Sequence, residues 1–453
     1  MYDGAPAPLS RTRTFALSSA LRQQSVDLFD QLKRTSLDGV GVSWETYGVS
    51  ETAACALIES HAQDAGLETK WDAARNLIVR LPGKNPALPA VATDLHLDSV
   101  PEGGNFVGAA GVVAGLVTLL DSQQRGGAER ELVHYALRGE ESAWFRGPCY
   151  FGSRVLFGGL MAADFASPHR SDRKTLEDSM RESVADIESG QPGLDPARLA
   201  CWFELHIEQG PVLIAWEKPV GLVTGIRGNI RHRQVNCRGE AAHYGAVPRW
   251  LRHDAVLAMS DLLVRIDEHW RVLLEWGEDL VVTAGIVETN PAEHAVSCVP
   301  GEVTFSLEYR SQDPKALDSF GALLQSECEQ VDEKRGVTFD LGPPSATVPA
   351  EMLPNIVKLL EDICSDCGTD FEIMPSGAGH DSSVFANAGV PSGMIFVRND
   401  KGRHNPHETM DFCDLFRRQR FLTARCRRRQ AARRITGHEQ CPHLGDGNRP
   451  HYD

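Results

Sequence analysis

The sequence predicts an α/β domain that is interrupted by an inserted α+β segment. Up to residue 213, strand-like and helix-like segments alternate along the chain, and this alternation is typical of an α/β sheet. From residue 214 the pattern changes to strands that two helices separate or follow, and after residue 332 the first pattern returns. An interrupted domain leaves a cleft between its two parts, and clefts are where ligands bind.

The first part of the α/β domain is expected to cover residues 1–213. Its helices are predicted from apolar residues at helical spacing, and its strands from short runs of apolar and β-branched residues. Amphipathic helices are expected at 20–35 and 51–66, an apolar helix with spaced glycines at 111–120, and strands at 76–81, 90–94, 132–137 and 203–207.

The inserted segment is expected to cover residues 214–332, and the α/β domain to resume over residues 333–415. The same periodicities predict the elements of both parts. In the insert, strands are expected at 221–226, 233–237, 280–287 and 303–309, with helices at 252–269 and 314–333; in the resumed domain, a helix is expected at 351–366 and a strand at 393–397.

A basic tail is expected at residues 416–453. Nine arginines lie between residues 417 and 434, and the last residues from 438 onward show no periodicity. Such a pattern is typical of a frayed, solvated tail, and nothing else in the sequence supports a nucleic-acid contact there.

The composition limits the partners of the chain. The 453 residues carry a formal net charge of −16, which argues against nonspecific nucleic-acid binding by the body of the protein. No apolar run approaches the ~18–20 residues that a membrane span needs, and residues 1–18 lack the apolar core of a secretory signal. The eleven cysteines are scattered and odd in number, as in a reduced, cytoplasmic protein.

Candidate catalytic residues follow the ends of predicted strands. His96 follows one strand, and Glu140 and Glu141 follow another. Sites in α/β sheets gather just beyond the carboxyl ends of strands. Imidazoles and carboxylates are ligands that zinc and manganese accept. In an extended segment Asp98 points the same way as His96 and can orient its ring. Adjacent carboxylates can divide their work between metal binding and general base catalysis.

The order and surroundings of these residues resemble the metal-dependent amidase branch of the M20 peptidase family. That branch includes N-carbamoyl-L-amino-acid hydrolases, β-ureidopropionases and allantoate amidohydrolases. The resemblance extends over about residues 50–410, and its most specific strings are His-Ile-Glu-Gln-Gly-Pro and Gly-Ala-Gly-His-Asp. The stretches that carry it are 96–104, 140–142, 151–154, 204–211, 252–255, 300–303, 376–381 and 404–408.

The resemblance implies a zinc-peptidase-like catalytic domain with a mixed sheet, and it identifies the insert with the family's lid and dimerisation domain. It also implies a metal-binding role for four residues. His96 and His206 would hold one ion, and Glu141 and His404 would hold the other. Glu140 would then be the general base.

The same resemblance implies the substrate contacts. Arg310 would bind a substrate carboxylate, a role that suits the fork of a guanidinium group. His243 would polarise the scissile carbonyl of the neighbouring subunit in a homodimer. The remaining residues expected to line the substrate pocket are Gln209, Ser297, Gly377 and His380.

Two positions depart from the family pattern. Val107 stands where the family has an aspartate that bridges both metal ions. Two dications about 3.5 Å apart repel by roughly 20 kcal/mol at an effective dielectric constant near 20, and a shared carboxylate offsets much of this. Ser297 stands where the family usually has an asparagine that stabilises the oxyanion. Losing one such donor typically costs ~10²–10³ in rate.

Three functions remain open from the sequence. The first is an amidohydrolase for a linear amide or N-carbamoyl bond in a small carboxylate-bearing compound, with one zinc or manganese ion per chain or a weakly held one. The second is a metal-independent reaction on an amino-acid-like substrate, such as amide or lactam formation, cyclisation or isomerisation. The third is a binding protein without catalysis, and the last two functions would need no metal.

Overall fold

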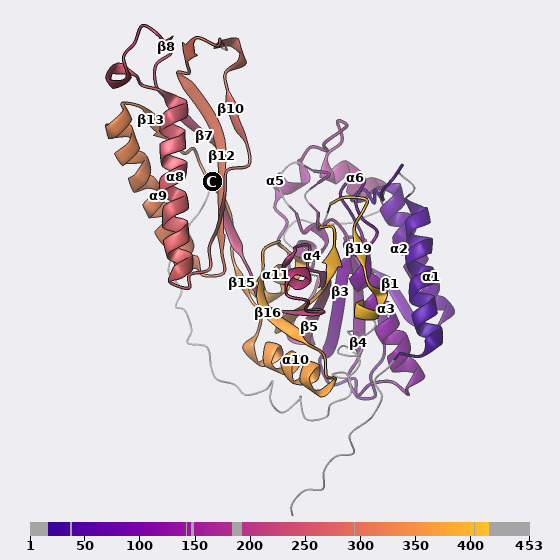
Figure 1. The fold of residues 1–453 in the computed structure, drawn as a ribbon. Coiled ribbons are helices and arrows are strands. Elements are labelled where there is room, and N and C mark those ends of the chain that lie inside the picture. The colour runs from indigo at the N-terminus through magenta and orange to yellow at the C-terminus, as the bar shows by residue number, and fades with distance from the viewer. Residues whose placement is uncertain are drawn as a thin grey trace, which may run out of the picture.

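The computed structural model describes residues 17–36, 39–141, 143–145, 149–183, 193–293, 295–402 and 404–415. The predicted basic tail, 416–453, lies outside these residues. Figure 1 shows two bodies joined at one side, each built around its own sheet. No helix in the described ranges is both long enough and apolar enough to cross a bilayer.

The larger body holds, within the described residues, a nine-stranded mixed sheet. Its centre is parallel, since β3 pairs in parallel with β4 and β5, and β5 with β17. This confirms the predicted mixed sheet. The strands run in the order β1 (Glu68–Trp71), β2 (Leu77–Leu81), β4 (Leu132–Leu137), β3 (Ala90–His96), β5 (Leu199–Ile207), β17 (Ser392–Val397), β6 (Val220–Ile226) and β15 (Ala350–Glu351), with β16 (Phe371–Ser376) beside β6.

Helices cover both faces of this sheet. On one face, α3 (Ala109–Gln124) packs against the central strands in one apolar core with α1 (Ser19–Thr35), α2 (Val49–Asp64) and α10 (Pro354–Asp366). On the other face, α11 (Asp381–Asn387) lies against β5, β17 and α4 (Phe151–Leu156). The shorter helices are α5 (Ala162–Phe165), α6 (Leu176–Glu182) and α7 (Val212–Ala215).

Glycine spacing lets α3 approach the sheet closely. A Cβ atom at Gly115 would lie only 2.2 Å from Nδ1 of His134 on β4. Every residue from Ala109 to Ser122 is buried, as the apolar run predicts. The start of α3 also lies against the carboxyl end of β3, since a Cβ atom at Gly108 would be only 2.5 Å from the carbonyl oxygen of His96.

The smaller body is an antiparallel sheet with two long helices on one face. In its described part the sheet has six strands, and α8 (Ala255–Glu275) and α9 (Pro314–Arg335) pack on it. Residues of β12 alternate between buried and half-buried, so one face is covered by the helices and the other is open. The strands are β10 (Val287–Thr289), β12 (Glu302–Ser311), β7 (Gly228–Arg238) and β13 (Thr338–Asp340), with β9 (Val281–Thr283) beside β12 and β14 (Ser345–Thr347) beside β7.

Strand pairing moves the predicted boundaries of the insert. β6 lies inside the predicted range 214–332 but pairs with β17 and β16 in the larger sheet. Conversely, β13 and β14 lie beyond residue 332 but pair with β7 in the smaller sheet. Local periodicity identifies a strand but not the sheet that accepts its hydrogen bonds. We therefore use the term inserted segment for residues 228–347.

Candidate active site

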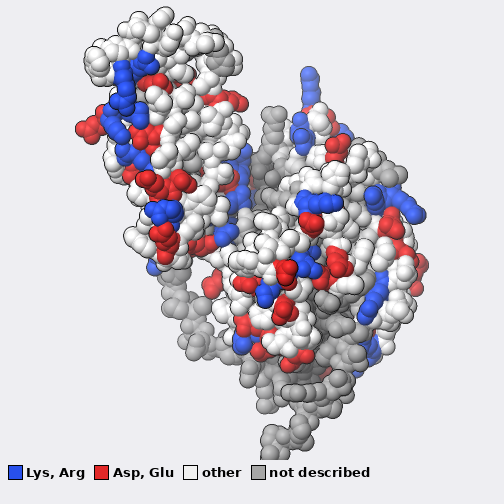
Figure 2. Space-filling view, in the orientation of Figure 1, with Lys and Arg blue, Asp and Glu red and all other residues white. Residues whose placement is uncertain are grey.

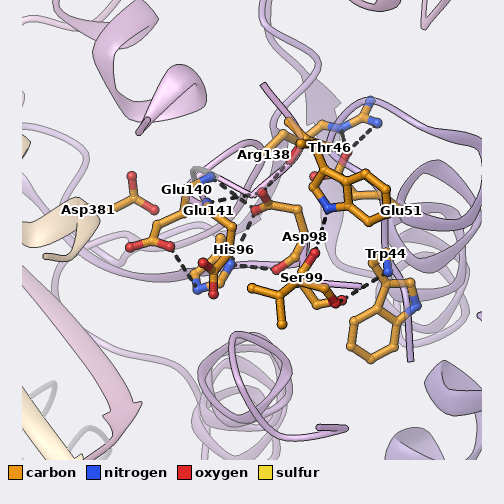
Figure 3. Close-up of polar contacts among 12 residues, drawn as sticks. Trp44, Thr46, Glu51, His96, Asp98, Ser99, Arg138, Glu140, Glu141 and Asp381 are labelled. Atoms are coloured by element: carbon orange, nitrogen blue, oxygen red, sulfur yellow. Dashed lines mark hydrogen bonds and ion pairs between the residues drawn. The ribbon is translucent and has the colours of Figure 1, made fainter. Parts of the chain in front are cut away.

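Four candidate residues meet at the carboxyl edge of the larger sheet. His96 is the last residue of β3, His206 is near the end of β5, and Glu140 and Glu141 follow β4. All four side chains are buried. The parallel strands end at the same edge, so residues far apart in the sequence come together there, as predicted. Figure 3 shows His96, Glu140 and Glu141 around Asp98.

Asp98 orients His96, as predicted, and it does so chiefly with its backbone. Nδ1 of His96 lies 2.8 Å from the carbonyl oxygen of Asp98 and 3.2 Å from its Oδ1. A carbonyl oxygen can only accept, so Nδ1 of His96 carries a proton. Nε2 is buried without a hydrogen-bond partner and lies 3.6 Å from Oε2 of Glu140.

The Asp98 carboxylate also holds the backbone of the two glutamates (Figure 3). Its Oδ1 accepts the N–H of Glu140 at 3.0 Å, and its Oδ2 accepts the N–H of Glu141 at 3.1 Å. The hydroxyl of Thr46 donates to Oδ2 at 2.6 Å. Thr46 was not predicted, because no motif marks a threonine that reaches the site from an N-terminal loop.

His404 and His206 complete the cluster. His404 lies between the short strands β18 (Asn399–Asp400) and β19 (Thr409–Met410), and its Nε2 is 3.1 Å from Oε1 of Glu141. Nδ1 of His206 donates to the carbonyl oxygen of Ile207 at 2.7 Å. The rings of His96 and His206 stack with centroids 5.9 Å apart. The four predicted metal-binding residues therefore surround one region.

Burial dominates the ionisation of Glu140. Burial raises the pKa of Glu140 well above its ordinary value; His96 opposes this, and the charges of Glu141 and Asp381 add to it. Burial alone would lower the pKa of His96, but Glu140 and Asp98 raise it well above its ordinary value. A buried carboxyl with a raised pKa beside an imidazole is an arrangement that suits general acid–base catalysis.

The donors at this edge fit a metal ion in kind but not in number. The orphaned Nε2 atom of His96 is what an imidazole ligand would present. Within the described residues, however, no three His, Cys, Asp or Glu side chains are placed to hold one ion together. A structural or catalytic zinc needs at least three protein ligands. The residues therefore do not fit a two-metal centre.

Val107, at the position where the family resemblance implies a bridging aspartate, is a buried core residue in this structure. Its side chain belongs to the apolar core and is 2% exposed. The backbone N–H groups of Phe106 and Val107 both donate to Oε1 of Glu408 at 3.1 Å, which fixes the loop before α3. Burial raises the pKa of Glu408 to about 7. Glu408 was not singled out from the sequence, although it ends the stretch 404–408 that carries the family resemblance.

Arg310 and Gly377, both predicted to bind substrate, are in contact. Nη1 of Arg310 donates to the carbonyl oxygen of Gly377 at 2.7 Å across the junction of the two bodies. Nε and Nη2 of Arg310 bind Oε1 of Glu308 at 2.7 and 2.6 Å. Glu308 was not identified as a site residue from the sequence.

Of the other residues expected to line the substrate pocket, His380 lies beside His206, and Gln209 follows β5. Nε2 of His380 lies 2.9 Å from Oγ of Ser376, and its ring is 4.6 Å from that of His206. Gln209 has a left-handed backbone with φ of 63°, and its N–H donates to Oδ1 of Asn399 at 3.0 Å.

His243 and Ser297 are not brought to this edge within one chain. His243 ends β8 (Ala242–His243), which pairs with β11 (Cys298–Val299) at the end of the inserted segment remote from the larger sheet (Figure 1). Both residues are exposed, and the N–H of Tyr244 donates to the carbonyl oxygen of Ser297 at 3.1 Å. The structure therefore does not place these two residues at the His96 cluster of the same chain.

Comparison with known proteins agrees with this architecture. The N-carbamoyl-L-amino-acid amidohydrolase of Paenarthrobacter aurescens is 33% identical over 394 residues, which cover 85% of this chain and 92% of that protein. The allantoate amidohydrolase of Escherichia coli (strain K12) is 30% identical over 353 residues, which cover 78% and 84%. A crystal structure of a hydantoinase/carbamoylase family amidase from Burkholderia multivorans matches with a TM-score of 0.82 and 25% identity, covering 91% of this chain and 98% of that one.

The family model of "Peptidase family M20/M25/M40" matches residues 92–427. This range includes the candidate residues at the carboxyl edge of the larger sheet, both before and after the insert, and it includes the whole inserted segment. The family expected from the sequence motifs is thereby confirmed: this chain belongs to peptidase family M20/M25/M40.

Proposed function

We propose that this protein hydrolyses a linear amide or N-carbamoyl bond in a small compound that carries a carboxylate. The observation that carries the proposal is the buried pair of His96 and Glu140, 3.6 Å apart, beside the second pair of His404 and Glu141. The names of the relatives support the bond type, since they act on N-carbamoyl-L-amino acids and allantoate.

In the proposed reaction Glu140 moves the proton. The oxygen of water adds to the carbonyl carbon while Glu140 accepts a proton from that water. As the C–N bond breaks, Glu140 returns the proton to the leaving nitrogen. Burial and the neighbouring carboxylates raise the pKa of Glu140, which favours the proton-bearing form that acts in the second step. Asp98 keeps the Glu140 backbone in place through its Oδ1.

A divalent ion is proposed as a weakly held addition, either zinc or manganese and about one per chain at most. His96 with His206, or Glu141 with His404, would supply two protein ligands to it. Such an ion supplies Lewis acidity for water or a carbonyl when it is bound.

We further propose that two copies of the chain assemble through the inserted segment, so that His243 and Ser297 reach the partner's substrate. Large apolar side chains are exposed at the end of this segment that carries β8, which supports a covered surface there. They are Tyr244, Trp250, Leu251 and Val296, with exposed fractions of 56, 82, 60 and 109%. We also infer a cytoplasmic location from the scattered cysteines, which are odd in number.

One observation favours a second candidate function. Within the part of the chain that the structure describes, no three protein donors converge, whereas Nε2 of His96 and Oε2 of Glu140 lie 3.6 Å apart. An acid and a base in contact could run a metal-independent reaction on an amino-acid-like substrate, such as cyclisation or isomerisation.

The test uses protein purified without added metal. Release of alanine from N-carbamoyl-L-alanine is measured before and after treatment with EDTA, together with metal content per chain. We expect turnover that falls at least ~10²-fold in Glu140→Gln, because general base catalysis contributes about 10²–10⁴. Glu302→Gln, an exposed change on β12, is the matched control and should retain full activity.

The outcomes separate the candidates. Turnover that EDTA abolishes supports a metal-assisted hydrolase. A reaction of this substrate that gives no alanine and survives EDTA supports the second candidate. Binding of N-carbamoyl-L-alanine without any turnover contradicts both and indicates a binding protein.

A further inference from the structure

Glu308 joins two arginines on the open face of the inserted sheet. Its Oε1 binds Nε and Nη2 of Arg310 at 2.7 and 2.6 Å, and its Oε2 binds Nε of Arg231 at 2.6 Å. The Glu308 side chain is 14% exposed, and the two arginines are about a third exposed or less. Arg231 and Glu308 are directly opposite each other on β7 and β12. A single carboxylate therefore holds both guanidinium groups.

These contacts leave one edge of Arg310 for a ligand. A guanidinium group has five N–H donors. Glu308 takes Nε–H and one Nη2–H, and the carbonyl oxygen of Gly377 takes one Nη1–H. Among the described contacts, one N–H on Nη1 and one on Nη2 are not taken by these two partners, and N–H groups on the two terminal nitrogens can bind the two oxygens of a carboxylate.

The loop that contacts Arg310 leads directly to the candidate active site. Gly377 follows Ser376, whose hydroxyl lies 2.9 Å from Nε2 of His380, and the ring of His380 is 4.6 Å from that of His206. Figure 2 shows basic side chains gathered on the side of the inserted segment that faces the larger body. The remaining edge of Arg310 thus lies where the two bodies meet.

The charges of the three residues are unequal. Two guanidinium groups against one carboxylate leave one net positive charge. Burial acts against ionisation of Glu308, but the hydrogen bond from Arg231 and the charges of Arg310 and Arg231 hold the pKa of Glu308 below its ordinary value. Glu308 therefore stays charged, and a ligand with one carboxylate neutralises the cluster.

We propose that Glu308 is a positioning residue that sets the specificity of Arg310 for a single substrate carboxylate. It orients the guanidinium group through Nε and Nη2 and presents the Nη1 and Nη2 edge to the ligand. This inference rests on the proposed function in one respect, namely that the substrate carries a carboxylate. It assigns to Glu308 an orienting effect on Arg310 rather than a contact with the reacting atoms.

If Glu308 had a different role, its removal would change the affinity for a carboxylate in the opposite direction. If Glu308 simply occupied Arg310 in place of substrate, its removal would strengthen carboxylate binding. The added positive charge would act in the same direction. A loss of carboxylate preference after the removal of Glu308 can therefore come only from loss of orientation.

The experiment compares two substitutions with the same change in charge. The Kd of N-carbamoyl-L-alanine and that of N-carbamoyl-L-alaninamide are measured by calorimetry in a Glu140→Gln background, which prevents turnover, and their ratio gives the carboxylate preference. Glu308→Met removes both acceptor oxygens, whereas Glu308→Gln keeps one oxygen that can still hold Arg310. We expect the preference to fall about tenfold in Glu308→Met, because a charge-assisted contact is lost, and much less in Glu308→Gln.

Controls separate orientation from folding. Glu302 lies on the same strand and the same face as Glu308, and it pairs with Arg238 of β7. Glu302→Met should therefore leave the carboxylate preference unchanged. If thermal melting shows that Glu308→Met is not folded, Glu308→Asp is measured in its place. That side chain keeps the charge but is too short to join both arginines, and the preference should still fall severalfold.

The results that overturn the inference are equally specific. A rise in preference in both Glu308→Met and Glu308→Gln identifies Glu308 as a competitor, and an unchanged preference in a folded Glu308→Met or Glu308→Asp removes its role. A Glu140→Gln protein that retains Glu308 and binds both probes equally also overturns it. Because binding is measured without turnover, carboxylate preference without hydrolysis refutes only the proposed reaction.

Discussion

Replacing Val107 with aspartate should convert the metal-poor site into one that holds two ions. Val107 precedes α3, and the next residue, Gly108, lies against His96: a Cβ there would be 3.0 Å from Cε1 of the His96 ring. Position 107 is therefore one residue away from the backbone that contacts His96, and a carboxylate there would lie close to the candidate metal-binding residues. Valine and aspartate have similar volumes, so the backbone need not move.

Without metal, the substitution should destabilise the protein. Val107 is 2% exposed, and a buried valine contributes about 1.5–3 kcal/mol relative to an exposed one. Burying a polar group without a partner costs a further ~1–3 kcal/mol. The sum, roughly 2.5–6 kcal/mol, is a large part of the ~5–15 kcal/mol that stabilises a typical domain. Metal at 100 times its Kd should restore about 2.7 kcal/mol.

The gain in metal binding should be larger than the loss in stability. Two dications about 3.5 Å apart repel by roughly 20 kcal/mol at an effective dielectric constant near 20. A carboxylate about 2 Å from both ions attracts each by on the order of 15 kcal/mol under the same conditions, which reverses the sign. The wild-type protein has no such group at this position.

Metal content per chain after dialysis against manganese or zinc provides the assay, with thermal melting in EDTA and in metal. We expect at most about one ion per chain in wild type and about two in Val107→Asp. Val107→Asn is the matched control, because it has the same shape and polarity but no charge. It should show the loss in stability without the gain in metal.

Equal metal content in Val107→Asp and wild type would refute this reasoning. The residues assigned to metal binding would then be wrong, because the missing ligand would not be what limits the site. Loss of stability that metal does not restore would lead to the same conclusion.

Three further predictions concern buried polar groups. Asp98→Asn places an amide N–H group where the Asp98 carboxylate accepts the backbone N–H groups of Glu140 and Glu141 in the wild type. We therefore expect kcat to fall about 10–100-fold while Glu140 stays in the site. Arg138→Met leaves the fully buried Glu51 carboxylate without its cation, 2.6 Å away in the wild type, and urea denaturation should show a loss of about 3–5 kcal/mol. Burial raises the pKa of Glu408 to about 7 from 4.5, so its stabilising effect is complete below pH 4.5 and is lost as pH rises through about 7. Glu408→Gln should therefore flatten the dependence of unfolding free energy on pH in that window.

Each of these has a contradicting result. Wild-type kcat in Asp98→Asn would show that the carboxylate does not orient the site. A loss below about 1 kcal/mol in Arg138→Met would show that the pair contributes little. An unchanged pH profile in Glu408→Gln would assign the titration to another group.

The helices and strands of the larger body could be predicted because their patterns are local. The apolar run with spaced glycines at 111–120 becomes α3, buried throughout, and the short apolar run at 132–137 becomes β4. The membership of strands in sheets could not be predicted in the same way. β6 lies inside the predicted insert but pairs in the larger sheet, and β13 lies outside it but pairs in the smaller sheet. The reason is that the pairing of a strand depends on partners far away in the chain.

The candidate site shows the same division. His96 and Asp98 are two residues apart on an extended segment, so their contact follows from sequence spacing. The contact of His404 with Glu141 joins residues 263 positions apart and was predicted only through resemblance to a family. The contact of Thr46 with Asp98 has no motif at all and appears only in the folded chain.

The sequence by itself determined the family, the mixed α/β architecture and the residue types available for catalysis, including the valine at position 107. These properties can be predicted from periodicity and from short motifs, because both are formed by residues that are close together in the sequence. Only the tertiary structure decided that Glu408 holds the Val107 loop and that Glu308 holds Arg310 in contact with Gly377. Such contacts form when separate elements pack together, and a side chain's partner across that packing depends on the whole fold.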